Sequence, residues 1–243
     1  MNTNPSALTI CIPAKNESRL LPALLMSLTR QDYPHMRHTK VFLADAGSTD
    51  GTPEIANGFR DRLDIEVIPG GLPSHGRNAG AARTQSEFVL FLDADIELKD
   101  PTLLRRAVEL AERRKLDCVT TNIWCSNGTF ADNSMYAFSN FMQYLSVLAA
   151  PFATGMFMLF RTSKFKEFGG FHEGALFAED YLLSKKVGCR RFGIISGGIH
   201  TTNRRFAKMG HMKVASLFIN TFFHSFSEKY FLRDHGYWNV PVN

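Results

Sequence analysis

The sequence has four cysteines among 243 residues, and no two of them form a C-x-x-C pair. They lie in or beside apolar runs, at Cys11, Cys118, Cys125 and Cys189. Disulfide-rich folds and cysteine-ligated zinc sites need closely paired cysteines, so both classes are excluded. We expect reduced thiols, as in a cytosolic protein.

Two other kinds of signal are also missing. The first expected strand begins near Leu8, which leaves no space before it for a charged leader and an apolar signal core. The sequence contains no recognition-helix, zinc-finger or aromatic RNA-binding motif. We therefore expect a cytoplasmic protein, free or at the inner face of the membrane, with no nucleic-acid partner.

Formal charge is absent from the 28 residues between 133 and 160. This length permits a membrane span. Asn140, Gln143, three serines and a proline argue against a span, because these groups are costly in a lipid core. We expect an amphipathic helix over about 134–149, followed by a strand over 155–160.

The remaining composition suits one large α/β domain, because 44% apolar and 12% aromatic residues can form a full core. The net charge of +5 is uneven, since residues 161–213 hold eleven Lys and Arg against four Asp and Glu. Such a basic region favours an anionic partner: a nucleotide diphosphate, a lipid phosphate or a membrane surface.

Apolar runs of strand type alternate with helical stripes through the first half of the chain. In the first stripe Leu21, Leu24, Leu25 and Leu28 recur at the i, i+3, i+4 and i+7 positions of a helix. This alternation predicts βαβ units and a mainly parallel sheet. The expected strands cover residues 8–13, 41–45, 65–68, 88–92 and 118–121, and a short helix is expected over 77–84.

Two carboxylates, Asp93 and Asp95, follow the strand expected at 88–92. Ligands of open parallel sheets bind beyond the carboxyl ends of the strands. Paired carboxylates there suit Mg²⁺ or Mn²⁺ that also holds a phosphate. Asp-x-Asp is common by chance, so neighbouring motifs must support it.

Several motifs together resemble the family 2 glycosyltransferases of GT-A fold, in particular their small bacterial members. They are Ile12-Pro-Ala-Lys-Asn-Glu17, Leu43-Ala-Asp-Ala-Gly-Ser-Thr-Asp-Gly-Thr52, Gly76-Arg-Asn-Ala-Gly80, Phe91-Leu-Asp-Ala-Asp95, Glu179-Asp180 and Asn203-Arg-Arg-Phe206. The resemblance implies a GT-A (Rossmann-like), mainly parallel sheet flanked by helices, with a C-terminal acceptor-side part. It implies a domain over 1–206, whose nucleotide-binding part covers about 8–121 and whose acceptor part covers about 122–206, and a helical extension over 207–243.

The resemblance also implies an inverting transfer of sugar from a nucleotide sugar, with UDP as the expected nucleotide. The residues implied in donor binding are Pro13, Ala14, Glu17, Asp45, Arg77, Asp93, Ala94, Arg204 and Arg205. Gly155 and Glu179 are expected on the acceptor side, and Asp180 is expected to act as general base. Asp93, Asp95 and His200 are the expected ligands of Mn²⁺ or Mg²⁺.

Each main role has a structural alternative. Asp45 can accept from the imide N–H of uracil or cap a helix, and Arg77 can bind a phosphate or a base edge or be a surface charge. Asp180 can take the proton of an acceptor hydroxyl or pair with a neighbouring lysine, Lys185 or Lys186. His200 can ligate a metal or be a structural histidine.

The C-terminal stretch predicts an amphipathic helix with basic ends over 214–232. Residues 214–227 carry no formal charge, and Phe218, Phe222, Phe226 and Tyr230 recur at i+4 spacing. Such a helix can pack on the core, form a homodimer or lie in a membrane interface, where it would give peripheral membrane contact near a lipid-linked acceptor.

Two other functions remain open from the residues alone. Asp93 can be the nucleophile of a phosphatase that forms an aspartyl phosphate, with Asp95 as the acid. The chain can also be a non-catalytic nucleotide-sugar-binding protein that keeps the fold. Thermal stabilisation by UDP with Mn²⁺ distinguishes a transferase from both, because neither of the other functions predicts metal-dependent binding of UDP.

Overall fold

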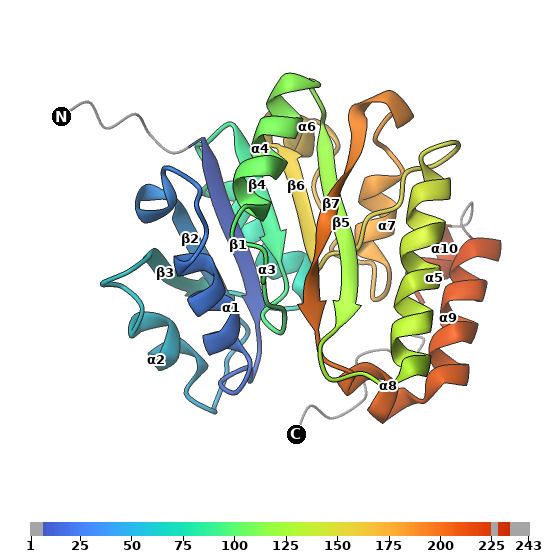
Figure 1. Ribbon diagram of the computed structural model, residues 1–243, viewed down its shortest axis with the longest axis horizontal. Helices are drawn as coiled ribbons and strands as arrows, with labels where there is room; N and C mark the ends of the chain where they lie inside the picture. The colour runs from blue at the N-terminus through green and yellow to red at the C-terminus, as the bar shows by residue number, and fades with distance from the viewer. Residues whose placement is uncertain (1–6, 225–227, 234–243) are drawn as a thin grey trace.

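The structure is a computed structural model that describes residues 7–224 and 228–233. Its centre is one seven-stranded sheet with the strand order β3-β2-β1-β4-β6-β5-β7 (Figure 1). The strands are β1 Leu8–Ala14, β2 Lys40–Asp45, β3 Asp64–Pro69, β4 Phe88–Leu92, β5 Cys118–Cys125, β6 Phe157–Arg161 and β7 Phe192–Thr201. Only β6 runs antiparallel to its neighbours, β4 and β5, so the prediction of a mainly parallel sheet is confirmed.

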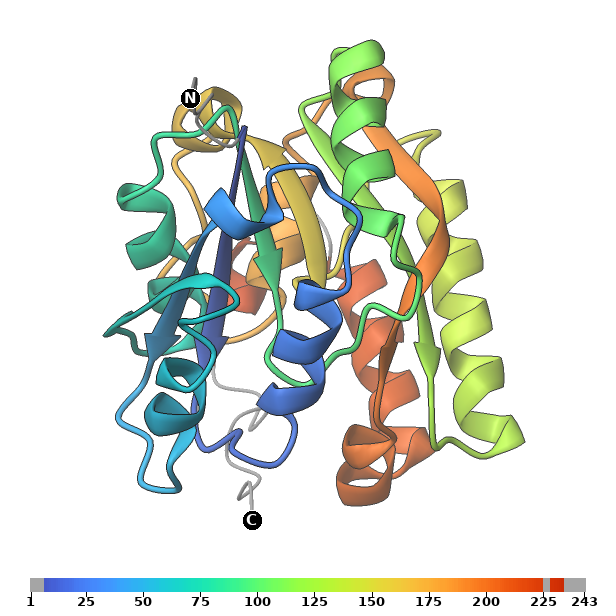
Figure 2. The same ribbon diagram turned by 60° about the vertical axis from the view of Figure 1, so that its left-hand side comes forward.

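Helices cover both faces of this sheet, as the two views show (Figures 1 and 2). They are α1 Leu21–Thr29, α2 Thr52–Asn57, α3 Pro73–Ala82, α4 Leu103–Arg113, α5 Phe130–Ser146, α6 Thr162–Glu167, α7 Glu179–Ser184, α8 Arg204–Met209, α9 His211–Phe223 and α10 Glu228–Phe231. Short 3₁₀ turns lie at Met36–His38 and Cys189–Arg191. The core groups α1, α2 and α4 with one face of the sheet and α3, α6 and α7 with the other.

Strand β4 shows why the sheet is buried on both faces. Phe88, Leu90 and Leu92 pack with α1 and α4, while Val89 and Phe91 face the helices on the opposite side. Side chains alternate along a strand, so an uninterrupted apolar run fills both cores. The first polar side chain after the run is therefore delivered to the strand's carboxyl end.

The predicted helices are present with shifted starts. Helix α3 begins at Pro73 rather than at residue 77, because proline is suited to the first turn of a helix. Helix α5 begins at Phe130, earlier than expected, since Thr129 and Asp132 form a reciprocal capping box. Strand β7 was not predicted, because three glycines interrupt its apolar pattern.

The C-terminal prediction of one helix over 214–232 is wrong for the described residues. Helix α9 ends at Phe223 and a separate helix, α10, begins at Glu228. Residues 225–227, with Phe226 among them, lie outside the part that the structure describes. Within the described part, no helix is both long enough and apolar enough to cross a bilayer.

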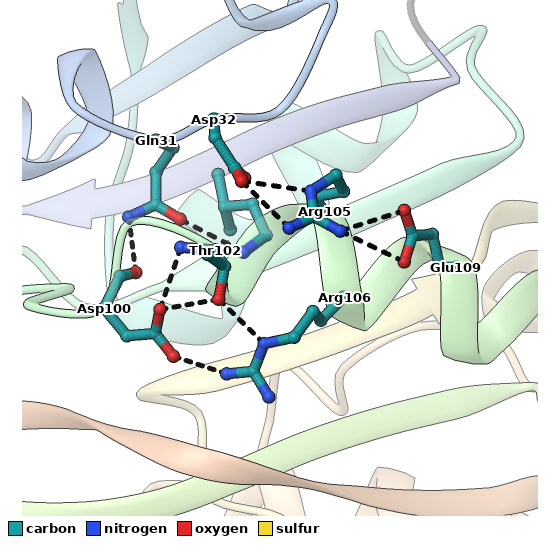
Figure 3. A network of polar contacts seen from close by, with 8 residues as sticks. Gln31, Asp32, Asp100, Thr102, Arg105, Arg106 and Glu109 are labelled. Carbon is teal, nitrogen blue, oxygen red and sulfur yellow. Dashed lines mark hydrogen bonds and ion pairs between the residues drawn. The ribbon is translucent and has the colours of Figure 1, made fainter.

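A polar network joins the segment that follows β4 to the residues just after α1 and to helix α4 (Figure 3). Gln31 donates to the carbonyl oxygen of Asp100 at 2.9 Å, and Arg106 pairs with the Asp100 carboxylate. Arg105 pairs with Asp32 at 2.9 Å. The chain that leaves the β4 aspartates is thus held at its far end, which favours a rigid site over a mobile loop.

Candidate active site

The loops after β1 and β2 are joined by hydrogen bonds at the carboxyl edge of the sheet, where the donor-binding residues are predicted. Asn16 accepts from the backbone N–H of Thr49 at 2.9 Å, and its own N–H donates to Ser48 Oγ at 2.8 Å. The N–H of Glu17 donates to Thr52 Oγ1 at 2.9 Å. The residues predicted at the end of β1, Pro13 and Ala14, therefore lead into a fixed rim at the carboxyl edge of the sheet.

Asp45 ends β2 inside this rim. Its Oδ2 accepts from the N–H groups of Gly47 and Ser48 at 3.1 and 3.0 Å. Its Oδ1 is buried without a hydrogen-bond partner among the described residues. The capping alternative is wrong, because Gly51 is the N-cap of α2. A buried carboxylate oxygen with no partner is costly, so this atom is suited to accept from a ligand N–H.

Arg204 links Asp95 to Glu17, which lies in the rim formed by the loops after β1 and β2. The guanidinium donates to both oxygens of Glu17, at 3.1 and 2.7 Å, and to Asp95 Oδ2 at 3.0 Å. Burial, and then the nearby Asp93 carboxylate, raise the pKa of Asp95. Burial likewise raises the pKa of Glu17. Three residues predicted from distant motifs thus meet, and Ala94 is buried beneath them.

Arg77 links Asp93, which was predicted to bind the donor, with Glu179, which was predicted on the acceptor side. Its Nη2 donates to Asp93 Oδ1 and its Nη1 to Glu179 Oε1, both at 2.6 Å. The guanidinium also lies over the ring of Phe171, 5.2 Å from the centroid. Arg77 is only 3% exposed, so the surface-charge alternative is wrong. It is an internal cation shared by two carboxylates.

Asp180 lies beside this cation at the start of α7. Its Oδ2 accepts from the N–H of Gly155 and its Oδ1 from the N–H of Tyr181, both at 2.7 Å. Burial, and then the Glu179 carboxylate, raise the pKa of Asp180 to about 6. A carboxylate poised near neutrality is suited to general-base work.

The predicted alternative, an ion pair of Asp180 with Lys185 or Lys186 just after α7, is not formed. Lys186 donates to the carbonyl oxygen of Phe168 at 2.8 Å. Lys185 lies over the ring of Tyr181, 5.7 Å from its centroid. Asp180 therefore has no lysine partner among the described residues that would hold it charged for structural reasons alone.

A cavity of about 120 Å³ runs from Asp93 to Asp180. Arg77, Gly155, Glu179 and Arg205 also line it, together with apolar side chains of α5 and α9. Arg205 thus belongs to this cavity, whereas its neighbour Arg204 belongs to the Glu17 cluster. The sequence grouped both arginines with the donor and did not separate them.

His200 is not brought to the two aspartates. It lies on β7, where its backbone forms a bridge with Glu97 through bonds of 2.7 and 2.9 Å. Burial, and then the Lys99 ammonium, lower the pKa of His200. Within residues 7–224 and 228–233, no three His, Cys, Asp or Glu side chains gather closely enough to hold an ion. The three predicted metal ligands therefore do not form one cluster.

The two aspartates still fit a divalent ion that is shared with a diphosphate. Arg77 takes one oxygen of Asp93, and Arg204 takes one oxygen of Asp95. The second oxygen of each carboxylate remains as a ligand, and both side chains are partly exposed, 24% and 20%. Hard oxygen ligands of this number suit Mg²⁺ or Mn²⁺, which usually complete their shells with phosphate and water.

The sequence missed the cavity's aromatic and aliphatic wall. Tyr136 and Ser139 come from α5, and Val214 and Leu217 come from α9. These positions carry no motif, since an apolar helix residue is equally suited to the core. Only the spacing of Val214 and Leu217, three residues apart, indicated one shared helix face.

Comparison with known proteins agrees with these features. The sequence model of "Glycosyl transferase family 2" matches residues 9–169. Staphylococcus aureus TarS, a poly(ribitol-phosphate) beta-N-acetylglucosaminyltransferase, is 30% identical over 132 residues, which are 53% of this chain and 23% of that protein. Glycosyltransferase AglE of Haloferax volcanii is 26% identical over 185 residues, which are 74% of this chain and 60% of that protein. The chain thus spans less than two thirds of either relative.

Solved structures show the same fold. TarS 1–349 in complex with UDP-GlcNAc superposes with a TM-score of 0.66 at 24% identity, covering 80% of this chain and 58% of that one. Mannosyltransferase PcManGT from Pyrobaculum calidifontis, in complex with GDP-Man and Mn²⁺, has a TM-score of 0.66 at 20% identity and covers 90% and 65%. The architecture is therefore that of the GT-A enzymes.

Proposed function

This chain belongs to glycosyl transferase family 2 and has the GT-A fold, and we propose that it is a glycosyltransferase that moves a sugar from a UDP-sugar to an acceptor hydroxyl with inversion. The observation that carries the proposal is the position of Asp180. Its carboxylate, with a pKa raised to about 6, lines a cavity that reaches Asp93 of the donor end. The proposed base and the proposed diphosphate site thus face one space.

The nucleotide base is proposed to bind at Asp45. The buried Oδ1 lacks a partner among the described residues, while Oδ2 is fixed by the N–H groups of Gly47 and Ser48. A uracil ring presents an imide N–H that can donate to Oδ1, and a bond to a charged acceptor is stronger than one between neutral groups. This match is our reason for choosing UDP.

The diphosphate is proposed to lie against Asp93, Asp95 and the nearby arginines. A bound Mn²⁺ or Mg²⁺, held by the second oxygens of the two aspartates, would neutralise the charge that develops on the diphosphate. Arg204 and Arg205 add positive charge on the same side, and the Arg204 contacts with Glu17 and Asp95 fix its direction. The PcManGT complex contains Mn²⁺, which supports a divalent ion here.

Asp180 is proposed to accept the proton of the acceptor hydroxyl. As that oxygen forms its bond to the anomeric carbon, the bond from this carbon to the diphosphate breaks on the opposite face, so the configuration inverts. The proton stays on Oδ1 or Oδ2 of Asp180, and UDP leaves. The N–H groups of Gly155 and Tyr181 hold the carboxylate in place during the transfer.

The other two functions have less support. A phosphatase of the aspartyl-phosphate type normally carries its nucleophile at the end of the first strand, whereas Asp93 follows β4, the fourth strand of the chain. A binding protein would not need Asp180, whose raised pKa suits catalysis.

We propose the cytoplasmic side of the membrane as the place of action and a lipid-linked hydroxyl as the acceptor, because the second half of the chain is basic.

Calorimetric titration with UDP, with and without Mn²⁺, tests the donor assignment. We expect binding that strengthens with Mn²⁺, followed by hydrolysis or transfer when UDP-sugars are supplied. Absence of UDP binding under both conditions would contradict the proposal. Tighter binding of GDP than of UDP would contradict the choice of base while leaving the transferase family unchanged.

A further inference from the structure

Helix α5 has its polar side inward and its apolar side outward. Its buried residues are Asp132, Tyr136, Asn140 and Gln143. A surface helix normally buries an apolar stripe and exposes charge. The reversal means that ordinary core packing does not explain the apolar residues of this helix.

Two of the inward polar residues of α5 form hydrogen bonds with the backbone of β5. Strand β6 pairs with β5 only at the first two residues of β5, Cys118 and Val119. Beyond that point Asn140 accepts from the N–H of Ile123 and donates to its carbonyl oxygen, both at 2.9 Å. Gln143 donates to the carbonyl oxygen of Thr121 at 3.2 Å. The orientation of α5 is therefore fixed, because turning it would leave these backbone groups unpaired.

The outward side carries six large apolar residues that we name the α5 apolar face. They are Phe130, Phe138, Phe141, Tyr144, Leu145 and Leu148, and Phe130 and Leu148 are 90% and 82% exposed. At 100° per residue all six fall in one stripe, in which Ser134 is the only exposed polar residue. Contiguous apolar surface of this kind marks an interaction site.

Basic residues follow the contacts that the two ends of α5 make with the rest of the chain. At its start, Asp132 bonds to His211 at 2.7 Å, and the exposed Lys208 and Lys213 lie within three residues of His211 in the sequence. At its end, the Cys189 thiol lies 3.5 Å from the carbonyl oxygen of Ala149, next to the exposed Arg190. The face itself carries no charge. This arrangement complements a surface that has anionic groups above an apolar layer.

We propose that the α5 apolar face docks on a lipid surface with anionic headgroups. The stripe from Phe130 to Leu148 spans 19 residues, is about 27 Å long and would lie along the interface rather than across the bilayer. Aromatic side chains suit this depth, because their rings tolerate the headgroup boundary. The docking goes beyond the transfer reaction, and it uses α5 in place of the C-terminal helix, whose Val214 and Leu217 line the cavity.

Docking would also place the acceptor cavity at the membrane. Tyr136 and Ser139 on α5 line that cavity, while Phe138 and Phe141 on the same helix would contact lipid. A hydroxyl on a lipid headgroup could then enter without leaving the interface. This second step rests on the proposed function, whereas the docking itself does not.

Flotation with vesicles tests the docking on the full chain. We would compare vesicles of phosphatidylcholine alone with vesicles that contain about one third phosphatidylglycerol, at low and at high salt. The test variant is Phe138→Gln/Phe141→Gln/Leu145→Gln. The matched control is Leu72→Gln, which replaces an exposed apolar residue just before α3, outside the α5 apolar face. Leu148→Glu is a second variant, at a site so exposed that the fold is retained.

The wild type and the control should float with the anionic vesicles, and less so at high salt. The triple variant should lose at least about tenfold in partitioning, because it removes three of the six large apolar side chains of the face. Leu148→Glu should also weaken binding, and UDP affinity should stay unchanged in all four proteins. Unchanged UDP affinity separates failure of docking from failure of the proposed function.

Three results would overturn the proposal. In the first, the wild type remains in the soluble fraction with anionic vesicles at low salt. In the second, the triple variant floats as well as the wild type. In the third, neither protein binds vesicles, and light scattering shows that the wild type is a dimer and the triple variant a monomer. A second copy of the chain would then be the partner of the α5 apolar face.

Discussion

The backbone N–H of Gly155 donates to Oδ2 of Asp180 over 2.7 Å, and this contact depends on the glycine having no side chain. A Cβ at this position would clash with the guanidinium of Arg77. The loop before β6 can therefore approach the base only while the residue at 155 is glycine.

Gly155→Ala should lower kcat by at least about tenfold, because a shift of about 1 Å at a catalytic group can cost about a hundredfold. UDP affinity should fall by less than kcat, since Glu17 and Asp45 of the proposed donor site lie on other loops, although Arg77 also contacts Asp93. Steady-state kinetics and calorimetry measure the two effects. Gly188→Ala is the control, because a Cβ there meets no atom within 4 Å. Equal kcat in both variants would contradict the positioning role.

Arg77→Met should destabilise the protein by about 3–5 kcal/mol, because it leaves the buried Glu179 and the partly exposed Asp93 without their shared cation. Denaturant unfolding gives this difference directly. Arg83→Met, which replaces an exposed arginine at the end of the same helix, should cost less than about 1 kcal/mol. Similar losses for the two variants would show that the buried pairing contributes little.

Asp45→Asn should weaken uridine binding by about 10- to 100-fold, because it replaces a charged acceptor by a neutral one. Titration with uridine rather than UDP isolates the base from the metal and the phosphates. Binding of the diphosphate part, probed with inorganic pyrophosphate and Mn²⁺, should not change. Unaltered uridine affinity would remove Asp45 from the base site.

Asp95→Ala should abolish the gain in UDP affinity that Mn²⁺ provides and leave the fold intact. The carboxylate is proposed to supply an oxygen to the ion, and its partner Arg204 keeps the contact with Glu17. UDP titrations with and without Mn²⁺ measure the gain. Glu97→Ala serves as the control two residues away. A full Mn²⁺ effect in Asp95→Ala would place the ion elsewhere.

Local motifs made much of this site predictable. Asp93 and Asp95 follow an apolar run, so their place at a strand's carboxyl end could be predicted from neighbouring residues alone. Contacts between distant segments could not. Arg77 and Glu179 are 102 positions apart, and only the fold brings them within 2.6 Å.

Helix α5 shows a different limit of prediction. The uncharged stretch, and the amides that argued against a membrane span, correctly indicated a helix. Which side of it is buried was not predictable, because Asn140 and Gln143 face inward to pair with β5. The usual rule, by which apolar residues point inward, gives the opposite orientation.

The account depends most on Asp180 as the base, and the pH profile of Asp180→Asn tests this role most directly. In the wild type the carboxylate must be deprotonated to accept a proton. Because its pKa is raised to about 6, kcat should be flat above that pH and fall about tenfold per unit below it.

The Asn variant should have kcat lowered by about 10²–10⁴-fold, no longer dependent on pH near 6, with UDP affinity within about threefold of the wild type. Retention of the wild-type kcat and pH profile, or loss of UDP binding with normal turnover at saturation, would contradict the assignment of Asp180 as the base.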